Sequence, residues 1–229
     1  MRLDRFLCNK TNLSRQQVNR LLAAGRVMVD AGIVSDGCTR ITPFSHVQLD
    51  QQTLQFRQAH YFMLNKPPGC VSATADPQHP TVLDFFHEPF KPELHIAGRL
   101  DFNSTGLMLI TNDGRWSRTI TEPREQKAKV YLVETEDAIH AETAEVFAGG
   151  IYFPFENITT QPAQLELLAE RRARLTLYEG RYHQVKRMFG RFNNKVLSLH
   201  RERMGNIELD ATLLPGQYRP LTQQEIGAS

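Results

Sequence analysis

Cysteine is scarce in this sequence of 229 residues, and its three cysteines stand far apart. Cys8, Cys38 and Cys70 form no CxxC pair, and an odd number cannot all be paired within one chain. The pattern argues against a disulfide framework and against a zinc ribbon. We therefore expect a protein of the reducing cytoplasm.

Long apolar runs are also missing. No stretch approaches the roughly 18 consecutive apolar residues that indicate a transmembrane helix. The first ten residues carry charges inside a short apolar patch and offer no small-residue cleavage site, so they do not resemble a secretory signal. We expect no membrane partner.

Several common catalytic motifs are absent. The sequence contains no GxxxxGK, no GxGxxG before a helix, no GxSxG and no HExxH. These absences argue against nucleotide hydrolysis, dinucleotide redox chemistry and serine esterase chemistry. His79, His87 and His95 have no cysteine partners nearby, so surface or hydrogen-bonded histidines are a better interpretation than metal ligands. We expect neither a metal nor a cofactor.

The composition that remains is typical of a soluble globular protein. Hydrophobic residues make up 41% of the chain and charged residues 23%. A chain of this length can bury a sizeable core without disulfides or metals, and it holds one large domain or two modest ones.

Positive charge is concentrated in two blocks. Residues 1–60 contain eight Lys and Arg against four Asp, and residues 171–203 contain ten Lys and Arg against only Glu179 and Glu202. Aromatic residues are interspersed in the second block. Clustered basic and aromatic residues are typical of a protein that binds a phosphate backbone, although a solvated helix face would give the same pattern.

The first block reads as a small domain of residues 1–58. Leu3, Phe6 and Leu7 form one helical stripe, and Ser14 with Gln17 forms a capping box for a second helix. Short strands follow at 26–30 and within 46–56, and the polar run at 50–60 suggests a linker. The basic residues that we expect to contact RNA are Arg2, Arg5, Arg15, Arg20 and Arg26.

A second domain is expected over residues 61–229. The pattern predicts strands and helices in a mixed order without a βαβ repeat, which indicates an α+β fold with a mixed, largely antiparallel sheet. The expected strands are 61–64, 106–111, 127–135, 165–168, 174–178, 196–199 and 207–209. The expected helices are 116–120, 139–147 and 185–192, with a helical turn at 81–86.

Two segments of this domain could carry chemistry. Gly98–Asp101 places a carboxylate just before the buried strand at 106–111, where a rigid element would hold it. Read alone, Asp101 could equally be an ordinary turn residue. Residues 179–188 place a glycine turn before a dense polar and basic cluster, which would also suit a simple phosphate-binding helix face.

Taken together, the motifs resemble a known family. The segments, in chain order, are NKPPG (65–69), AGRLDFNSTGLMLITNDG (97–114), KVYLV (129–133), EGRYHQVKRM (179–188) and LHRERMGNIELD (199–210). They resemble the ribosomal small subunit pseudouridine synthases. The first domain resembles the ribosomal-protein-S4-like RNA-binding domain that such enzymes carry, although Gln16–Asn19 is more polar than is usual there. The resemblance covers almost the whole chain.

This resemblance implies an isomerase that converts one uridine of 16S rRNA, at position 516, to pseudouridine without a cofactor. It assigns the essential carboxylate to Asp101, which could attack C1′ or the base, or act as a base that generates a glycal. It implies a monomer whose partner is 16S rRNA, alone or within an assembling small-subunit particle. It implies no metal.

The resemblance also assigns substrate-binding residues. Lys186 would pair with Asp101, assumed to be buried, and keep it ionised. Tyr131 would stack on the target base, and Arg99 could fill the gap that the extruded base leaves. The residues that would shape the pocket or hold phosphates are Gly180, Arg181, His183 and Gln184.

Three alternatives stay open. A synthase with the same catalytic domain could act on large-subunit or transfer RNA. A non-catalytic RNA-binding assembly factor would need the basic blocks but not Asp101. An aspartyl hydrolase of phosphate or glycosidic bonds is a third alternative, against which the lack of a metal cluster or of an obvious second carboxylate beside Asp101 counts.

Overall fold

A computed structural model describes residues 1–227 of the chain. The chain folds into two compact units, Met1–Ala59 and a second unit that begins at His60. Residues 228 and 229 of the expected second domain lie outside the described range.

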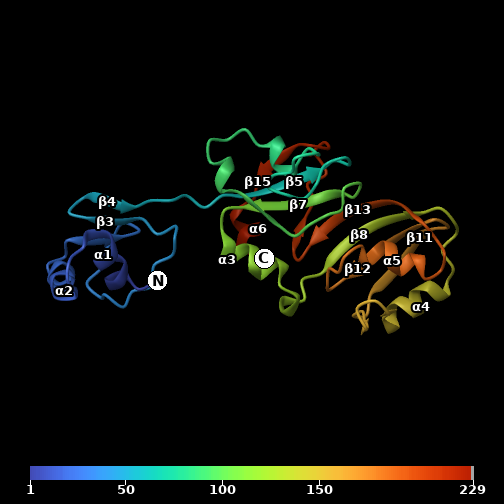
Figure 1. The fold of residues 1–229 in the computed structure, drawn as a ribbon, viewed down its shortest axis with the longest axis horizontal. Helices are drawn as coiled ribbons and strands as arrows, with labels where there is room; N and C mark the ends of the chain where they lie inside the picture. Colours follow the sequence, from blue (N-terminus) through green and yellow to red (C-terminus); the bar gives the residue numbers. More distant parts are fainter. Residues whose placement is uncertain (228–229) are drawn as a thin grey trace. The chain divides into compact units, whose positions relative to one another are not determined.

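The first unit consists of two helices and a four-stranded antiparallel sheet (Figure 1). In chain order the elements are α1 (Leu3–Thr11), α2 (Arg15–Ala23), β1 (Val27–Val29), β2 (Gly32–Ile33), β3 (Val47–Leu49) and β4 (Gln52–Gln55). The predicted capping box begins α2, since Ser14 and Gln17 each accept a hydrogen bond from the other's backbone N–H. Leu3, Phe6 and Leu7 are buried in the core of this unit, as their spacing predicts.

The expectation of a linker at 50–60 is wrong for residues 50–55. Residues 47–55 form a β-hairpin, β3–β4, whose two turn residues Asp50 and Gln51 have φ of 49° and 67°. Two consecutive positive φ values match the right-handed twist of a tight hairpin. The usual residues at these two positions are Asn-Gly or Asp-Gly. No glycine stands here, so the turn signal was missing.

The second unit is built around a nine-stranded sheet, seven strands of which follow the order β11-β12-β8-β13-β7-β5-β15 (Figure 1). These strands are β5 (Tyr61–Lys66), β7 (Thr105–Thr111), β8 (Lys129–Thr135), β11 (Gln164–Ala169), β12 (Arg172–Leu177), β13 (Val196–Met204) and β15 (Tyr218–Pro220). Two short strands, β6 (His95–Ala97) and β14 (Ile207–Glu208), pair with β7 and β13. Every pairing is antiparallel except that of β13 with β7. The predicted α+β class with a mixed, largely antiparallel sheet is confirmed.

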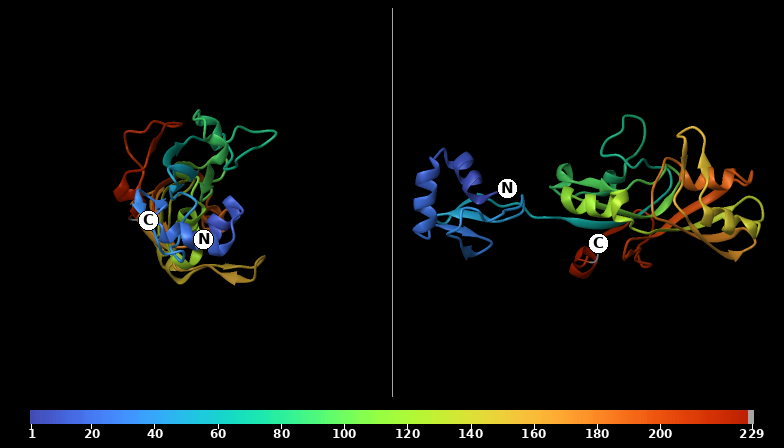
Figure 2. Two further views of the ribbon diagram at one scale, coloured as in Figure 1. Left: turned by 90° about the vertical axis from the view of Figure 1, so that its left-hand side faces the viewer. Right: turned by 90° about the horizontal axis from the view of Figure 1, so that it is seen from below.

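The helices of this unit are α3 (Gly114–Thr121), α4 (Glu142–Gly149), α5 (Gln184–Gly190) and α6 (Gln223–Gly227), with 3₁₀ turns at Val82–Phe85, Lys91–Glu93 and Pro123–Glu125. A hairpin of β9 (Tyr152–Phe153) and β10 (Ile158–Thr159) follows α4. Figure 2 shows α4 and this hairpin at the opposite end of the sheet from α3. Strands β6, β9, β10 and β15, each of two or three residues, were not predicted.

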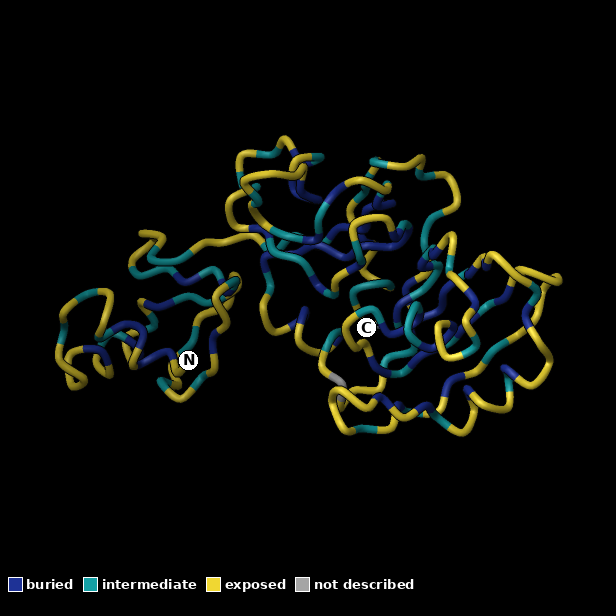
Figure 3. The backbone as a smooth tube through the Cα atoms, turned by 45° about the vertical axis from the view of Figure 1, so that its right-hand side comes forward, coloured by how far each residue is buried: buried dark blue, intermediate teal, exposed yellow. Residues whose placement is uncertain are grey.

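The sheet is covered on both faces. Along β7, Met108 and Ile110 pack into one hydrophobic core, while Leu107 and Leu109 pack into the other. This two-sided burial explains why the strand reads as a continuous apolar run instead of an alternating one. Figure 3 shows the buried residues concentrated along the central strands.

Gly106 allows β7 to lie against β13. Its φ is +98°, and a Cβ at this position would lie 2.4 Å from the carbonyl oxygen of Arg201. A larger residue would therefore be strained and would also clash with the partner backbone. This parallel pairing joins the two halves of the sheet, and the loop that carries Asp101 leads directly into β7.

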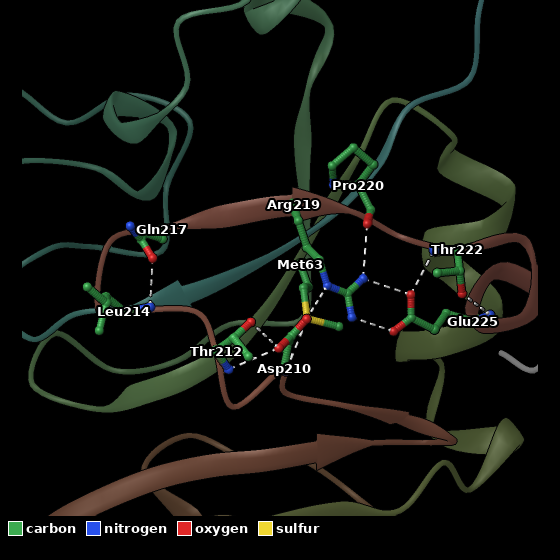
Figure 4. A network of polar contacts seen from close by, with 9 residues as sticks. All are labelled: Met63, Asp210, Thr212, Leu214, Gln217, Arg219, Pro220, Thr222 and Glu225. Carbon is green, nitrogen blue, oxygen red and sulfur yellow. Dashed lines mark hydrogen bonds and ion pairs between the residues drawn. The ribbon is translucent and has the colours of Figure 1, made fainter.

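A polar cluster fixes the C-terminal helix to the sheet (Figure 4). Arg219 of β15 lies between two carboxylates, with its Nε 2.7 Å from Oδ2 of Asp210 and its Nη2 2.8 Å from Oε1 of Glu225. The pKa of each carboxyl group falls to about 2. Arg219 is the main cause for Glu225, whereas hydrogen bonds from Thr212 are the main cause for Asp210.

Candidate active site

A cavity of about 560 Å³ lies in the second unit. It is formed by the loop at 98–104, by strands β8 and β13, and by the loop at 179–183 with the start of α5. All the predicted catalytic and substrate-binding residues line it. They are Arg99, Asp101, Tyr131, Gly180, Arg181, His183, Gln184 and Lys186.

Asp101 contacts two basic side chains in this cavity. Its Oδ2 lies 3.4 Å from Nζ of Lys186, and its Oδ1 lies 3.5 Å from Nε2 of His183. The predicted pairing with Lys186 is therefore present, while the contact with His183 was not foreseen. The side chain of Asp101 is 28% exposed, so the assumption of a buried carboxylate was wrong. An open cavity leaves this carboxylate accessible to a substrate.

A buried lysine holds the loop that carries Asp101. Lys66, fully buried at the end of β5, donates hydrogen bonds to the carbonyl oxygens of Pro67, Phe102 and Ser104 at 2.8–3.1 Å. Burial lowers its pKa. Lys66 lies in the NKPPG segment of the resemblance, but no role was predicted for it. Its partners Phe102 and Ser104 are remote in the chain, so the sequence does not show that they meet.

Tyr131 is both a core residue and part of the cavity wall. It lies on β8, opposite Leu175 of β12 and Arg201 of β13, and is only 7% exposed. Its ring packs in the larger hydrophobic core and also lines the cavity. A base that enters the cavity would therefore meet an aromatic ring already held in place by packing.

Glu179 organises the loop that precedes α5. This buried carboxylate accepts hydrogen bonds from Nε of Arg181 at 2.9 Å, from Nε2 of Gln184 at 2.8 Å and from the backbone of Gln161 at 3.0 Å. Glu179 thus lines the cavity as a second carboxylate, engaged with its own loop. Since Oε1 of Gln184 also accepts from the backbone of Arg181 at 3.0 Å, both ends of its amide are engaged within the loop.

The same loop aims His183 at Asp101. His183 precedes α5 with φ 49° and ψ 32°, a left-handed conformation that is uncommon outside glycine. Unfavourable local geometry of this kind persists only where the surrounding structure imposes it, and it is frequent at functional sites. Here the hydrogen bonds around Glu179 supply that constraint.

Two further cations line the cavity. Arg201 is 1% exposed, and it donates from Nε to the carbonyl of Leu107 at 2.7 Å and from Nη1 to that of Arg99 at 3.3 Å. Lys129 is also buried, and its pKa is lowered by burial and by the charge of Arg201. Sequence reasoning missed both, although Arg201 lies in the LHRERM segment. The cavity therefore has a positive lining, which suits a phosphorylated or strongly polar ligand.

The basic residues predicted to contact RNA in the first unit are all exposed, but they do not form one group. Arg2, Arg5 and Arg15 line a shallow hollow of about 350 Å³, where Asp4 lies 2.6 Å from Arg2 and 3.4 Å from Arg15. Arg20 and Arg26 lie outside this hollow, and Arg26 forms an ion pair with Asp50.

Within residues 1–227, no group of three or more His, Cys, Asp and Glu side chains could hold a metal ion. In the same range, no helix is both long and apolar enough to cross a membrane.

Comparison with known proteins places these features in context. Residues 60–190 match the family described as RNA pseudouridylate synthase. A relative from Pseudomonas aeruginosa, named ribosomal small subunit pseudouridine synthase A, is 58% identical over 227 residues, covering 99% of this chain and 99% of the relative. A relative of the same name from Escherichia coli strain K12 is 49% identical over 229 residues, covering 100% of this chain and 99% of the relative.

A solved structure titled "Crystal structure of pseudouridylate synthase" is also similar to this chain. It has a TM-score of 0.73 and 41% sequence identity, and the match covers 100% of this chain and 99% of that one. The likeness therefore extends over both units in sequence as well as in fold.

Proposed function

The chain belongs to the RNA pseudouridylate synthase family, and we propose that it isomerises one uridine of 16S rRNA, at position 516, by a cofactor-free mechanism that depends on Asp101. Members of this family are isomerases. Support for the small-subunit substrate comes from the names of relatives that are similar over nearly the full chain.

The reaction breaks the N1–C1′ bond of uridine, turns the base and forms a C5–C1′ bond. The hydrogen on C5 leaves as a proton, and N1 gains one, so no oxidant, reductant or external group is consumed. A carboxylate is needed either to attack C1′ or the base, or to remove a proton and generate a glycal. In this account Asp101 supplies it in each case.

The observation that carries the proposal is the convergence on Asp101. An accessible carboxylate, an ammonium group 3.4 Å away and an imidazole 3.5 Å away occupy one cavity together with the ring of Tyr131. A flipped uracil could stack on that ring while its C1′ or C6 approached the carboxylate. The buried cations Lys129 and Arg201 would offset negative charge from the nucleotide.

We further propose that the first unit is an S4-like domain that docks RNA through Arg2, Arg5 and Arg15, with Arg20 and Arg26 as outlying contacts. The five side chains are exposed, and this unit carries an excess of positive charge. Such contacts would fix the position of the enzyme on RNA without reading its sequence.

The test is to map pseudouridines in unmodified 16S rRNA, free and within small-subunit particles, after incubation with the protein. We expect one new pseudouridine, at position 516. A pseudouridine found instead in large-subunit or transfer RNA would contradict the substrate assignment. Binding of 16S rRNA with no pseudouridine in any RNA would indicate an assembly factor.

A further inference from the structure

Tyr182 presents an exposed aromatic ring at the cavity. The residue is 77% exposed, so its ring gains little of the stabilisation that burial in a core would give. Its ring stacks on the imidazole of His183, with centroids 3.9 Å apart and planes inclined by 22°. Because the imidazole covers one face of the ring and most of the residue is still exposed, the other face is open to a planar ligand.

The position of this ring relates it to the reacting groups. Tyr182 lines the cavity and directly precedes His183, whose Nε2 lies 3.5 Å from the carboxylate of Asp101. A planar group stacked on Tyr182 would thus lie beside the nucleotide at Asp101, not in its place. Tyr131, which lines the cavity from β8, is the aromatic residue available to the target base itself.

The charge around Tyr182 indicates which planar ligand fits. Exposed Arg99 and Arg181 and partly exposed Lys186 line the same cavity as Tyr182. A positive surface with an interspersed aromatic ring is the usual arrangement for a single-stranded nucleic acid, whose phosphates meet the cations while its bases stack on the ring.

Extraction of a uridine also creates a need for such a ring. When the uridine leaves its stack, each neighbouring base loses a stacking partner, which is part of the energy that the enzyme must supply. An aromatic side chain that covers one of these faces offsets the loss. Its stacking tolerates any base, because every base has a π-face.

We propose that Tyr182 stacks on the RNA base adjacent in sequence to the uridine that enters the cavity, and so helps to hold the RNA in its opened conformation. This inference rests on the proposed function for its choice of RNA. It assigns to Tyr182 a role in binding, not in the bond-breaking steps.

The test is a double-mutant cycle between protein and RNA. Affinity is measured for a 16S rRNA fragment that contains uridine 516, intact or with an abasic residue on either side of that uridine. Tyr182→Ala removes the ring and Tyr182→Phe keeps it, while Phe155→Ala removes a ring that is 97% exposed but does not line the cavity. The phenol hydroxyl of Tyr182 has no hydrogen-bond partner among residues 1–227, so Phe is a conservative replacement.

We expect Tyr182→Ala to weaken binding of the intact fragment by about tenfold to a hundredfold, the range for loss of one base–aromatic stack. It should bind one of the two abasic fragments no more weakly than the wild type does. Tyr182→Phe and Phe155→Ala should bind like the wild type, and melting temperatures should be unchanged because the ring is exposed.

The proposal is overturned if Tyr182→Ala binds the intact fragment with normal affinity. It is also overturned if the substitution lowers the affinity for both abasic fragments as much as for the intact one. The second result would point to a protein or phosphate contact instead of a base. If the wild type forms no pseudouridine in 16S rRNA but the cycle still shows coupling, the proposed function fails and the stacking role of Tyr182 stands.

Discussion

Lys186 places its Nζ 3.4 Å from Oδ2 of Asp101, so that an ammonium group on α5 meets a carboxylate on the loop before β7. Both side chains are partly exposed, at 39% and 28%. Ion pairs with this exposure contribute only about 0–1 kcal/mol to folding stability. The pairing therefore matters for the arrangement of charge in the cavity far more than for the fold.

Lys186→Met should lower turnover by about a hundredfold or more, the size of effect found when a preorganised charged or polar donor is removed from a reacting site. The melting temperature should change by no more than about 4 °C, given the small stability of the pair. Steady-state rates and thermal melts of the same preparation separate the two effects. Lys195→Met, which removes an exposed lysine outside the cavity, is the matched control, and equal turnover of both variants would contradict the role of Lys186.

Tyr131 requires variants that separate packing from stacking, because it is buried in the core and lines the cavity. Tyr131→Ala would lose both, with a packing cost of about 3–5 kcal/mol. Tyr131→Leu should keep most of the stability but slow pseudouridine formation by about tenfold to a hundredfold, since a stacked base is worth about 1–3 kcal/mol. Tyr131→Phe should retain stability and stacking. Normal rates in a folded Leu variant would remove Tyr131 from the site.

Removal of residues 1–59 should leave the second unit folded. The two hydrophobic cores of that unit contain no residue from the first 59. Circular dichroism should show a cooperative melt for the truncated chain. Its affinity for RNA should fall. If Arg2, Arg5 and Arg15 each contact a phosphate, the slope of log K against log salt should become less negative by roughly two to three.

An unfolded truncated chain would show that the second unit depends on the first. An unchanged salt dependence would show that the arginines of the first unit do not contact the RNA backbone.

The cluster around Arg219 should make stability fall in acid. Glu225 and Asp210 have pKa values of about 2 in the folded protein, below the usual 4.5 and 3.8. A lowered pKa stabilises the fold fully above the unfolded value, and this contribution is lost as pH falls through the folded value. The window is therefore about pH 5 to 2.

Glu225→Gln should lower the melting temperature by a few degrees at pH 7 and should flatten its decline between pH 5 and 2. Glu208→Gln, at an exposed position of β14 with no ion pair among the described residues, should melt like the wild type at each pH. Parallel acid profiles for Glu225→Gln and the wild type would contradict this assignment.

Local sequence patterns were sufficient to predict the structure where one segment determines its own conformation. The apolar run of β7 and the capping box of α2 are of this kind, and so is the position of Asp101 just before a buried strand. The β3–β4 hairpin was missed because its turn residues, Asp50 and Gln51, adopt positive φ without a glycine.

The site residues that sequence reasoning missed share a different feature. Lys66 binds carbonyls of the loop at 102–104, and Arg201 binds those of Arg99 and Leu107. Glu179 likewise accepts a hydrogen bond from the backbone of Gln161, which lies 18 residues earlier in the chain. Such roles depend on how the folded chain brings separate segments together, so neither periodicity nor residue type reveals them. The resemblance to a family supplied Lys186 and Tyr131, which residue patterns alone would have left as a helix and a strand position.

The most direct test of the account is release of tritium from 16S rRNA labelled at C5 of uridine, measured for the wild type and for Asp101→Asn. Formation of the C5–C1′ bond expels that hydrogen, so release reports the isomerisation itself. Asn is nearly isosteric with Asp but supplies no carboxylate, so it should leave folding and RNA affinity close to normal. We predict release by the wild type and none above background from Asp101→Asn. Equal release from a folded Asp101→Asn variant would contradict the assignment of the catalytic carboxylate.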